Sequence, residues 1–324
     1  YSMTDKIKIF NSHLLKELCK DIDLNSATIK FPNDVLSYII ESFTYEAGVR
    51  DLKRKVEKIL NKINLEKLYQ SGLFESQLYS EDNPLVITKE MVDKFLDKPQ
   101  IISRVIHDTN EVGVINGLYA TTTGPGGVLP IIVYKNYSGE NKFKIKITGQ
   151  QKSVMKESIH YSLTLSMNLL KHTFISEFMK KFPSGLHIHT PDGSTPKDGP
   201  SAGAAFTTVF ISTILNMKIK NNVAMTGEID LNGNITAIGG LESKLIGAKK
   251  AGINLVFVPY ENEKDYKKIL KKNSELFDDT FKIQIVKHIS SILELCLIDP
   301  KIFDKLKSKN ITFEKTFSCS EYLN

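Results

Sequence analysis

The chain has 324 residues, of which 41% are hydrophobic and 25% are charged. These are ordinary values for a globular protein, and the length predicts two domains that each bury a core. The formal net charge is +6, from 43 Lys+Arg against 37 Asp+Glu, and it is spread along the chain. Such an excess is compatible with weak nucleic-acid contact, although no Arg-rich or aromatic-interleaved patch supports it. No apolar run reaches about 18 residues, so we expect no membrane span.

The three cysteines, Cys19, Cys296 and Cys319, lie far apart in the sequence. This spacing predicts neither a disulfide framework nor a zinc site, so we expect a reducing compartment and no bound metal. The chain begins at Tyr1 within a helical pattern and without a signal or transit segment. We therefore expect a fragment whose targeting segment is not present.

Residues 1–100 have a helical pattern. Apolar residues keep helical spacing over 7–18, 35–43 and 52–63, with Lys and Glu opposite the last stripe. A strand-like Leu85-Val86-Ile87 and a short helix over 91–96 follow. We predict a small all-α domain.

Residues 101–299 change to strands, Gly-rich turns and intervening helices. Helices are expected at 153–182, 202–215, 241–251, 264–271 and 288–297, and strands at 113–119, 128–133, 143–147, 186–189, 255–259 and 283–286. Asn232-Gly233 predicts a hairpin between 223–229 and 235–238. The elements predict an α/β (α+β-like) domain, and 300–324 is a Lys-rich tail with little core signal.

The loop at 195–203 stands out by its proline and glycine content. Pro196 and Pro200 fix φ, and Gly199 and Gly203 allow close backbone approach. Pro200 fits the first position of a helix, which would place Ser201 in the first turn at the positive end of the helix dipole. A serine there is usually a cap, but an alkoxide or oxyanion is stabilised at the same place.

Lys244 is the second candidate, because it shares a helix face with the apolar Leu241 and Ala248. Removal from water lowers the pKa of a lysine, which can then take the proton of a serine hydroxyl. The alternative is a lysine that extends from the helix flank into solvent. Thr226 precedes Gly227 in a predicted strand and is placed either to orient a neighbouring amine or to serve as a structural threonine.

Two further interpretations remain open on the residues alone. His187 and His189 share one strand face and, with Ser201 and Asp198, offer a Ser-His-Asp alternative. Asp198 is equally suited to cap a helix or to hold Lys197 or Lys244 by charge. In the second interpretation, residues 199–205 weakly resemble the Gly/Ser-rich phosphate loop of GHMP-type kinases.

Several motifs, in this order, resemble the proteolytic domain of Lon proteases. They are Ile147-Thr148-Gly149-Gln150, Val154-Met155-Lys156-Glu157-Ser158, Leu186-His187-Ile188-His189, Thr195-Pro196-Lys197-Asp198-Gly199-Pro200-Ser201-Ala202-Gly203, Met225-Thr226-Gly227-Glu228-Ile229 and Ile238-Gly239-Gly240-Leu241-Glu242-Ser243-Lys244. The resemblance covers roughly residues 109–299. Upstream, Tyr45-Glu46-Ala47-Gly48-Val49-Arg50-Asp51-Leu52 is similar to the small helical lid of the same family's AAA+ module.

The resemblance implies a catalytic dyad of Ser201 as nucleophile and Lys244 as general base, with Thr226 positioning Lys244. Asp198, His187 and His189 would line the site, and Ala202 would support it where backbone N–H groups near Ser201 form the oxyanion hole. Arg50 would correspond to the lid arginine that senses bound nucleotide.

At the level of the whole protein, the resemblance implies an ATP-dependent serine endopeptidase that degrades unfolded or damaged proteins in a homohexameric ring. Peptide hydrolysis would need no cofactor. ATP and Mg would be bound mainly by residues absent here, so we expect no ATPase activity from this chain. The expected location is the mitochondrial matrix or a bacterial-type cytoplasm.

Overall fold

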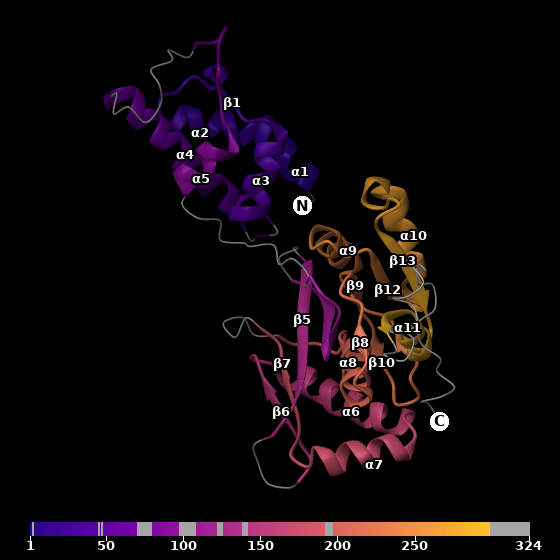
Figure 1. The fold of residues 1–324 in the computed structure, drawn as a ribbon. Helices are drawn as coiled ribbons and strands as arrows, with labels where there is room; N and C mark the ends of the chain where they lie inside the picture. The colour runs from indigo at the N-terminus through magenta and orange to yellow at the C-terminus, as the bar shows by residue number, and fades with distance from the viewer. Residues whose placement is uncertain are drawn as a thin grey trace, which may run out of the picture. The chain divides into compact units, whose positions relative to one another are not determined.

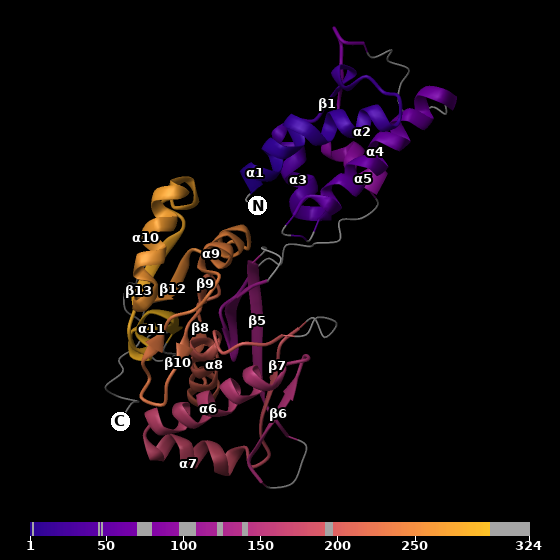
Figure 2. The same cartoon turned by 180° about the vertical axis from the view of Figure 1, so that it is seen from behind.

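The computed structural model describes residues 1, 3–44, 46, 48–69, 80–96, 108–121, 126–137, 142–191 and 197–298. Two compact units divide the chain, the first built mainly from Tyr1–Ser103 and the second from Arg104–Thr121 and Gly126–Asn324 (Figures 1 and 2). The predicted tail at 300–324 and the first two residues of the 195–203 loop lie outside the described residues.

The first unit is the predicted small helical domain. Its elements are α1 (Met3–Ile9), the π-helical η1 (Phe10–Leu14), α2 (Leu15–Asp21), the 3₁₀ turn η2 (Ser26–Thr28), β1 (Ile29–Lys30), α3 (Asn33–Phe43), α4 (Arg50–Tyr69), β2 (Leu85–Val86) and α5 (Lys89–Leu96). Its core is formed by the apolar stripes of these helices, with Phe10, Leu36, Ile39, Leu52 and Ile59 fully buried. The prediction of a helical domain is confirmed, with a two-stranded parallel pair, β1–β2, as its β-structure among the described residues.

The second unit is built on a mixed seven-stranded sheet. In spatial order its strands are β13 (Lys282–Val286), β12 (Leu255–Pro259), β9 (Val223–Met225), β4 (Val114–Ala120), β5 (Gly126–Lys135), β7 (Gly185–His189) and β6 (Lys144–Thr148). β5 runs antiparallel to both of its neighbours, and the other described pairings in this sheet are parallel. A small antiparallel sheet joins β14 (Leu297–Ile298), β8 (Lys218–Ile219) and β3 (Glu111–Val112), and β10 (Glu228–Ile229) forms a hairpin with β11 (Ile235–Thr236).

Helices cover both faces of the seven-stranded sheet (Figure 1). One face packs against α6 (Ser153–Leu169), α7 (His172–Lys181), α8 (Gly203–Leu215) and α11 (Ile289–Cys296). The other packs against α9 (Leu241–Lys250) and α10 (Glu263–Lys272). The 3₁₀ turns η3 (Tyr260–Asn262) and η4 (Ser274–Leu276) link α10 to β12 and β13. The predicted α/β class of this domain is therefore confirmed. α8 is buried over nearly its whole length, as expected of a helix that is apolar on all sides.

Three predicted elements differ from the structure. The helix expected at 153–182 is two helices, because the buried Leu170 adopts an extended conformation and the chain turns there, which brings Phe178 of α7 into the same core. The helix expected from Ala202 begins at Gly203. The hairpin around Asn232-Gly233 is shorter than expected, because β9 belongs to the large sheet and only β10 and β11 pair across the turn.

Candidate active site

Ser201 lies in the turn immediately before α8, not in the first helical turn as the position of Pro200 predicted. Ala202 is the N-cap residue of α8 and is almost fully buried. The carbonyl of Ser201 accepts hydrogen bonds from the Gly227 N–H at 2.8 Å and from Thr226 Oγ1 at 3.2 Å. The turn that carries Ser201 is therefore fixed to the segment that follows β9.

A second set of contacts fixes the loop before Ser201. Asp198 Oδ1 accepts from the Gly199 N–H at 3.0 Å and from the Met155 N–H at 3.1 Å. The Lys197 N–H donates to the Gln150 carbonyl at 3.1 Å. Asp198 thus satisfies an unpaired N–H at the start of α6, which is the capping role, although the capped helix is not the one that follows the loop. Gly199 has φ +113°, a conformation that favours glycine.

Lys244 reaches Ser201 from α9, on the opposite side of the sheet from α8. Its side chain lies on the apolar face of α9 with Leu245 and Ala248 and is 3% exposed. Nζ lies 3.1 Å from Ser201 Oγ and 3.1 Å from Thr226 Oγ1. The structure thus brings together Ser201, Lys244 and Thr226, three residues that the sequence places in three different elements.

Backbone contact between α9 and β5 makes this approach possible. A Cβ added to Gly247 would lie 2.4 Å from the carbonyl of Gly126, and one added to Gly126 would lie 2.3 Å from the carbonyl of Ser243. Only glycine permits such close contact of a helix with a strand. Gly126 and Gly247 are therefore site-positioning residues that the sequence analysis missed, and the glycine inside a predicted helix was the available signal.

Burial changes the acid–base chemistry of Lys244. Removal from water lowers the pKa of its ammonium from 10.5 to about 8. Loss of hydration disfavours the charged form, so a substantial fraction of Lys244 is neutral near pH 8. A neutral amine within 3.1 Å of a serine hydroxyl can accept its proton.

Thr226 is a second hydrogen-bond partner of the Lys244 amine. It is fully buried, and its N–H donates to the Phe257 carbonyl of β12 at 3.2 Å. Because the Thr226 hydroxyl hydrogen is directed to the Ser201 carbonyl, Thr226 Oγ1 is left to accept from Lys244. One N–H of a neutral Lys244 is then directed to Thr226, and its lone pair is available to the Ser201 hydroxyl.

The two histidines lie elsewhere on the sheet. His187 and His189 lie on one face of β7, where His187 Nε2 and His189 Nδ1 are 2.9 and 2.8 Å from Thr148 Oγ1. Burial, with Lys146 and His189 nearby, lowers the pKa of His187. Within the described part of the chain, neither histidine hydrogen-bonds to Ser201 or Asp198, so the Ser-His-Asp constellation is not assembled. Thr148, which joins the two rings, was not singled out from the sequence.

Arg50 belongs to the first unit, where it is exposed at the first residue of α4. In the described ranges no three or more His, Cys, Asp or Glu side chains cluster as metal ligands would. None of the described helices combines the length and apolarity needed to cross a membrane.

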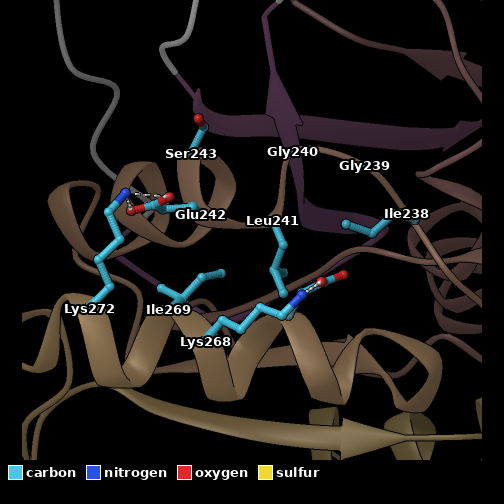
Figure 3. Close-up of a pocket in the computed structure, with 10 residues that line it drawn as sticks. Ile238, Gly239, Gly240, Leu241, Glu242, Ser243, Lys268, Ile269 and Lys272 are labelled. Carbon is cyan, nitrogen blue, oxygen red and sulfur yellow. Dashed lines mark hydrogen bonds and ion pairs between the residues drawn. The ribbon is translucent and has the colours of Figure 1, made fainter. Parts of the chain in front are cut away.

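A shallow pocket of about 470 Å³ opens beside the start of α9 (Figure 3). Its lining comes from Ile238 to Ser243 and from α10. Lys272 spans it to Glu242, with Nζ–Oε1 at 3.1 Å. Ser201, Thr226 and Lys244 are not among its lining residues, so this pocket is separate from the Ser201–Lys244 pair.

Comparison with known proteins places the chain in a family. Residues 86–299 match the Lon protease (S16) C-terminal proteolytic domain, and residues 20–72 match the Lon protease AAA+ ATPase lid domain. A Lon protease homolog of Acanthamoeba polyphaga mimivirus is 44% identical over 94% of this chain and 35% of its own length. Lon proteases of Buchnera aphidicola and Chlamydia trachomatis are 36% and 34% identical over 92% and 87% of this chain.

The chain spans about a third of the length of these relatives, 35% or 36% in each case. The two matched domains follow one another in the order that the sequence motifs predicted, and together they leave no support for the kinase-like alternative. This chain belongs to the Lon protease family.

Proposed function

We propose that this chain carries the peptidase site of an ATP-dependent serine endopeptidase, with Ser201 as nucleophile and Lys244 as general base. The observation that supports this most directly is the 3.1 Å separation between Ser201 Oγ and a buried Lys244 Nζ. A lysine in water is almost fully protonated at neutral pH and is a poor base, whereas one with a pKa of about 8 is well matched to proton transfer there.

In the proposed reaction, Ser201 Oγ attacks the peptide carbonyl as Lys244 Nζ takes its proton. Collapse of the tetrahedral intermediate breaks the C–N bond, and the Lys244 ammonium returns the proton to the leaving amine. Water then attacks the acyl carbon as Lys244 Nζ takes its proton. The bond between the acyl carbon and Ser201 Oγ breaks, and the Lys244 ammonium returns the proton to Oγ. Peptide hydrolysis by this route needs no cofactor.

The oxyanion of the intermediate would be stabilised by the backbone before α8. Among the described residues the N–H groups of Ser201 and Ala202 have no hydrogen-bond acceptor, and they lie at the N-terminal, positive end of a thirteen-residue helix. Donors that are already fixed before the charge develops are the usual source of this stabilisation. We assign the principal role to the Ala202 N–H.

Asp198 and the histidines support the site indirectly. Asp198 ties the Ser201 loop to α6 through the Met155 N–H, so we propose that it fixes the loop. We place His187 and His189 on the substrate side of β7, with Thr148 between them.

At the level of the whole protein we propose unfolded or damaged proteins as substrates, a homohexameric ring, and nucleotide sensing by Arg50 with ATP and Mg bound mainly by residues outside this chain. Its relatives' names and the lid match support this proposal. The proposed location is the mitochondrial matrix or a bacterial-type cytoplasm. The net charge of +6 is the sole support for weak nucleic-acid contact.

Covalent labelling tests the nucleophile and the base together. A peptidyl phosphonate that reacts with activated serines should modify Ser201, and the rate of modification should rise with pH through about 8, where Lys244 loses its proton. Mass spectrometry of the labelled chain at a series of pH values measures both. A label on another residue would contradict the proposal, and a rise centred near the ordinary histidine pKa of about 6.5 would favour the histidine alternative.

Thr226→Val tests the orientation of Lys244. Valine keeps the shape of threonine but removes the oxygen that accepts from Lys244 Nζ and the hydrogen that Ser201 O accepts. We expect kcat to fall about tenfold, in line with the loss of one orienting hydrogen bond worth about 1.4 kcal/mol in the transition state. Peptide kinetics measure the change, and Thr226→Ser should recover most of the activity. Unchanged kcat in the valine variant would assign Thr226 a structural role only.

A further inference from the structure

Two side chains after β12 hold the segment that leads into α9. Asn262 Oδ1 accepts from the Ile238 N–H at 2.9 Å, and Asn262 Nδ2 donates to the Ile238 carbonyl at 3.0 Å. The exposed Glu261 adds a bond from the Ala237 N–H to its Oε2 at 2.7 Å. Asn262 is 3% exposed. A single buried amide therefore pairs with both backbone groups of Ile238, as a neighbouring strand would.

Ile238 is hydrogen-bonded to Asn262 two residues before Gly240, which packs closely against Ala120. Gly239 and Gly240 follow Ile238. Glycine has more backbone freedom than any other residue type. Gly240 is the N-cap of α9 with φ +69°, and no side chain caps this end of the helix. The pocket of about 470 Å³ is lined by the same turn, from Ile238 to Ser243, and by α10 (Figure 3). The Asn262 contact therefore acts together with the close contact of Ser243 and Gly247 with Gly126 in setting where α9 begins.

The segment that carries Asn262 also holds Thr226. The Thr226 N–H donates to the carbonyl of Phe257 in β12, five residues before Asn262. β12 and η3 thus fix, from one continuous stretch of chain, both the threonine that orients Lys244 and the approach to the helix that carries Lys244. A change in the Asn262 contact would move Lys244 relative to Thr226 and Ser201.

We propose that Asn262 is a positioning residue for the Ser201–Lys244 pair, which it maintains by fixing Ile238 and hence the start of α9. This inference rests on the proposed peptidase function. Without the Asn262 bonds the first turn of α9 can move toward the open pocket, and water gains access to the Lys244 side chain. The pKa of Lys244, lowered by burial alone, then returns toward its value in water.

Asn262→Leu is the test, because leucine fills a similar volume and removes both bonds to Ile238, together with the bond from Asn262 Nδ2 to Asp265 Oδ2 at 3.2 Å. We expect kcat/KM for a peptide at pH 7 to fall about tenfold, and the rise of kcat/KM with pH to move from about 8 to higher pH by about one unit. Activity should therefore recover in part near pH 9.5. The folded fraction of each variant is measured by circular dichroism under the assay conditions.

Asn254→Leu is the control for loss of an asparagine hydrogen bond at an exposed position next to β12. Asn254 directly precedes β12, and its Nδ2 donates to one backbone carbonyl, that of Thr280, at 2.9 Å. The same substitution there should leave the pH profile unchanged. Asn262→Gln gives a milder perturbation if Asn262→Leu does not fold, because its longer side chain cannot pair with both groups of Ile238, and it should shift the profile in the same direction.

Two outcomes separate this inference from the proposed function. If the Asn262 variants lose activity equally at all pH values, the residue is merely structural and the inference is wrong, while the Ser201–Lys244 mechanism stands. If kcat/KM of the unchanged protein does not rise near pH 8, and the peptidyl phosphonate does not label Ser201, the mechanism itself is wrong. The inference is supported if the rise of kcat/KM moves to higher pH in the Asn262 variants and stays near pH 8 in Asn254→Leu and in the unchanged protein.

Discussion

Lys244→Met is expected to lower peptide hydrolysis by about 10³-fold or more while it stabilises the folded chain at neutral pH. Methionine fills the apolar space beside Leu245 and Ala248 but has no nitrogen to accept the Ser201 proton. Loss of a general base that also activates the nucleophile costs about 10²–10⁴-fold in rate. Peptide kinetics over a range of pH measure this loss, which should not be recovered at any pH.

The expected gain in stability follows from the lowered pKa. Between pH 8 and 10.5 the unfolded chain binds more protons at Lys244 than the folded chain does, so the free energy of unfolding rises with pH in this window. Below pH 8 the full penalty for burying the charge is present, about 3 kcal/mol from the displaced pKa. Loss of the hydrogen bonds to Ser201 and Thr226 offsets part of the gain, which leaves about 1–3 kcal/mol.

Chemical denaturation at pH 7 and at pH 10 measures the difference in free energy of unfolding between Lys244→Met and the wild-type chain. This difference should shrink as the pH rises. Lys250→Met is the control, since Lys250 is exposed on the same helix and its replacement should change stability by less than about 0.5 kcal/mol and leave activity intact. Substantial activity in Lys244→Met would contradict the assigned base. A stability difference between Lys244→Met and the wild-type chain that is the same at both pH values would show that Lys244 is not desolvated in the folded chain.

The sequence predicted those features of the site that depend on local pattern. Helical spacing placed Lys244 on the same face as Leu241 and Ala248, and all three are buried in α9. The proline and glycine content of the 195–203 loop marked the turn before α8, and Asn232-Gly233 marked the hairpin, where Gly233 has φ +87°. In each case one or two residues constrain the backbone by their own geometry, so the signal is readable without tertiary structure.

The features that were missed depend on partners distant in sequence. Asp198 bonds to an N–H 43 residues away in α6, and Asn262 bonds to Ile238 from 24 residues away. Thr148 joins two histidines about 40 residues further along the chain, at separations of 39 and 41. Such contacts arise from the order of strands in the sheet, and a local pattern carries no information about them. The break at Leu170 is of the same kind, because burial and not a glycine or proline ends the helix there.

Gly247→Ala is expected to lower activity about 10²-fold and to destabilise the second unit by about 1–2 kcal/mol. Two effects oppose each other at this position. Alanine in place of glycine in a helix interior favours folding by about 1 kcal/mol. The added Cβ would lie 2.4 Å from backbone atoms of Gly126, however, and a strand backbone cannot rotate away as a side chain can. Overpacking of this kind costs about 1–3 kcal/mol or more, so the steric effect should exceed the gain in helix propensity.

The loss of activity follows because α9 can relieve this contact only by moving away from β5, and Lys244 moves with it. A displacement of about 1 Å is enough to cost about 10²-fold in rate when a base must meet a hydroxyl. Gly239→Ala is the matched control: no heavy atom lies within 4 Å of its added Cβ, so stability and activity should change little. Peptide kinetics and chemical denaturation of both variants measure these effects. Wild-type activity in Gly247→Ala would show that Lys244 reaches Ser201 without close contact between α9 and β5, and that the lysine side chain, not the helix position, sets the distance between the two residues.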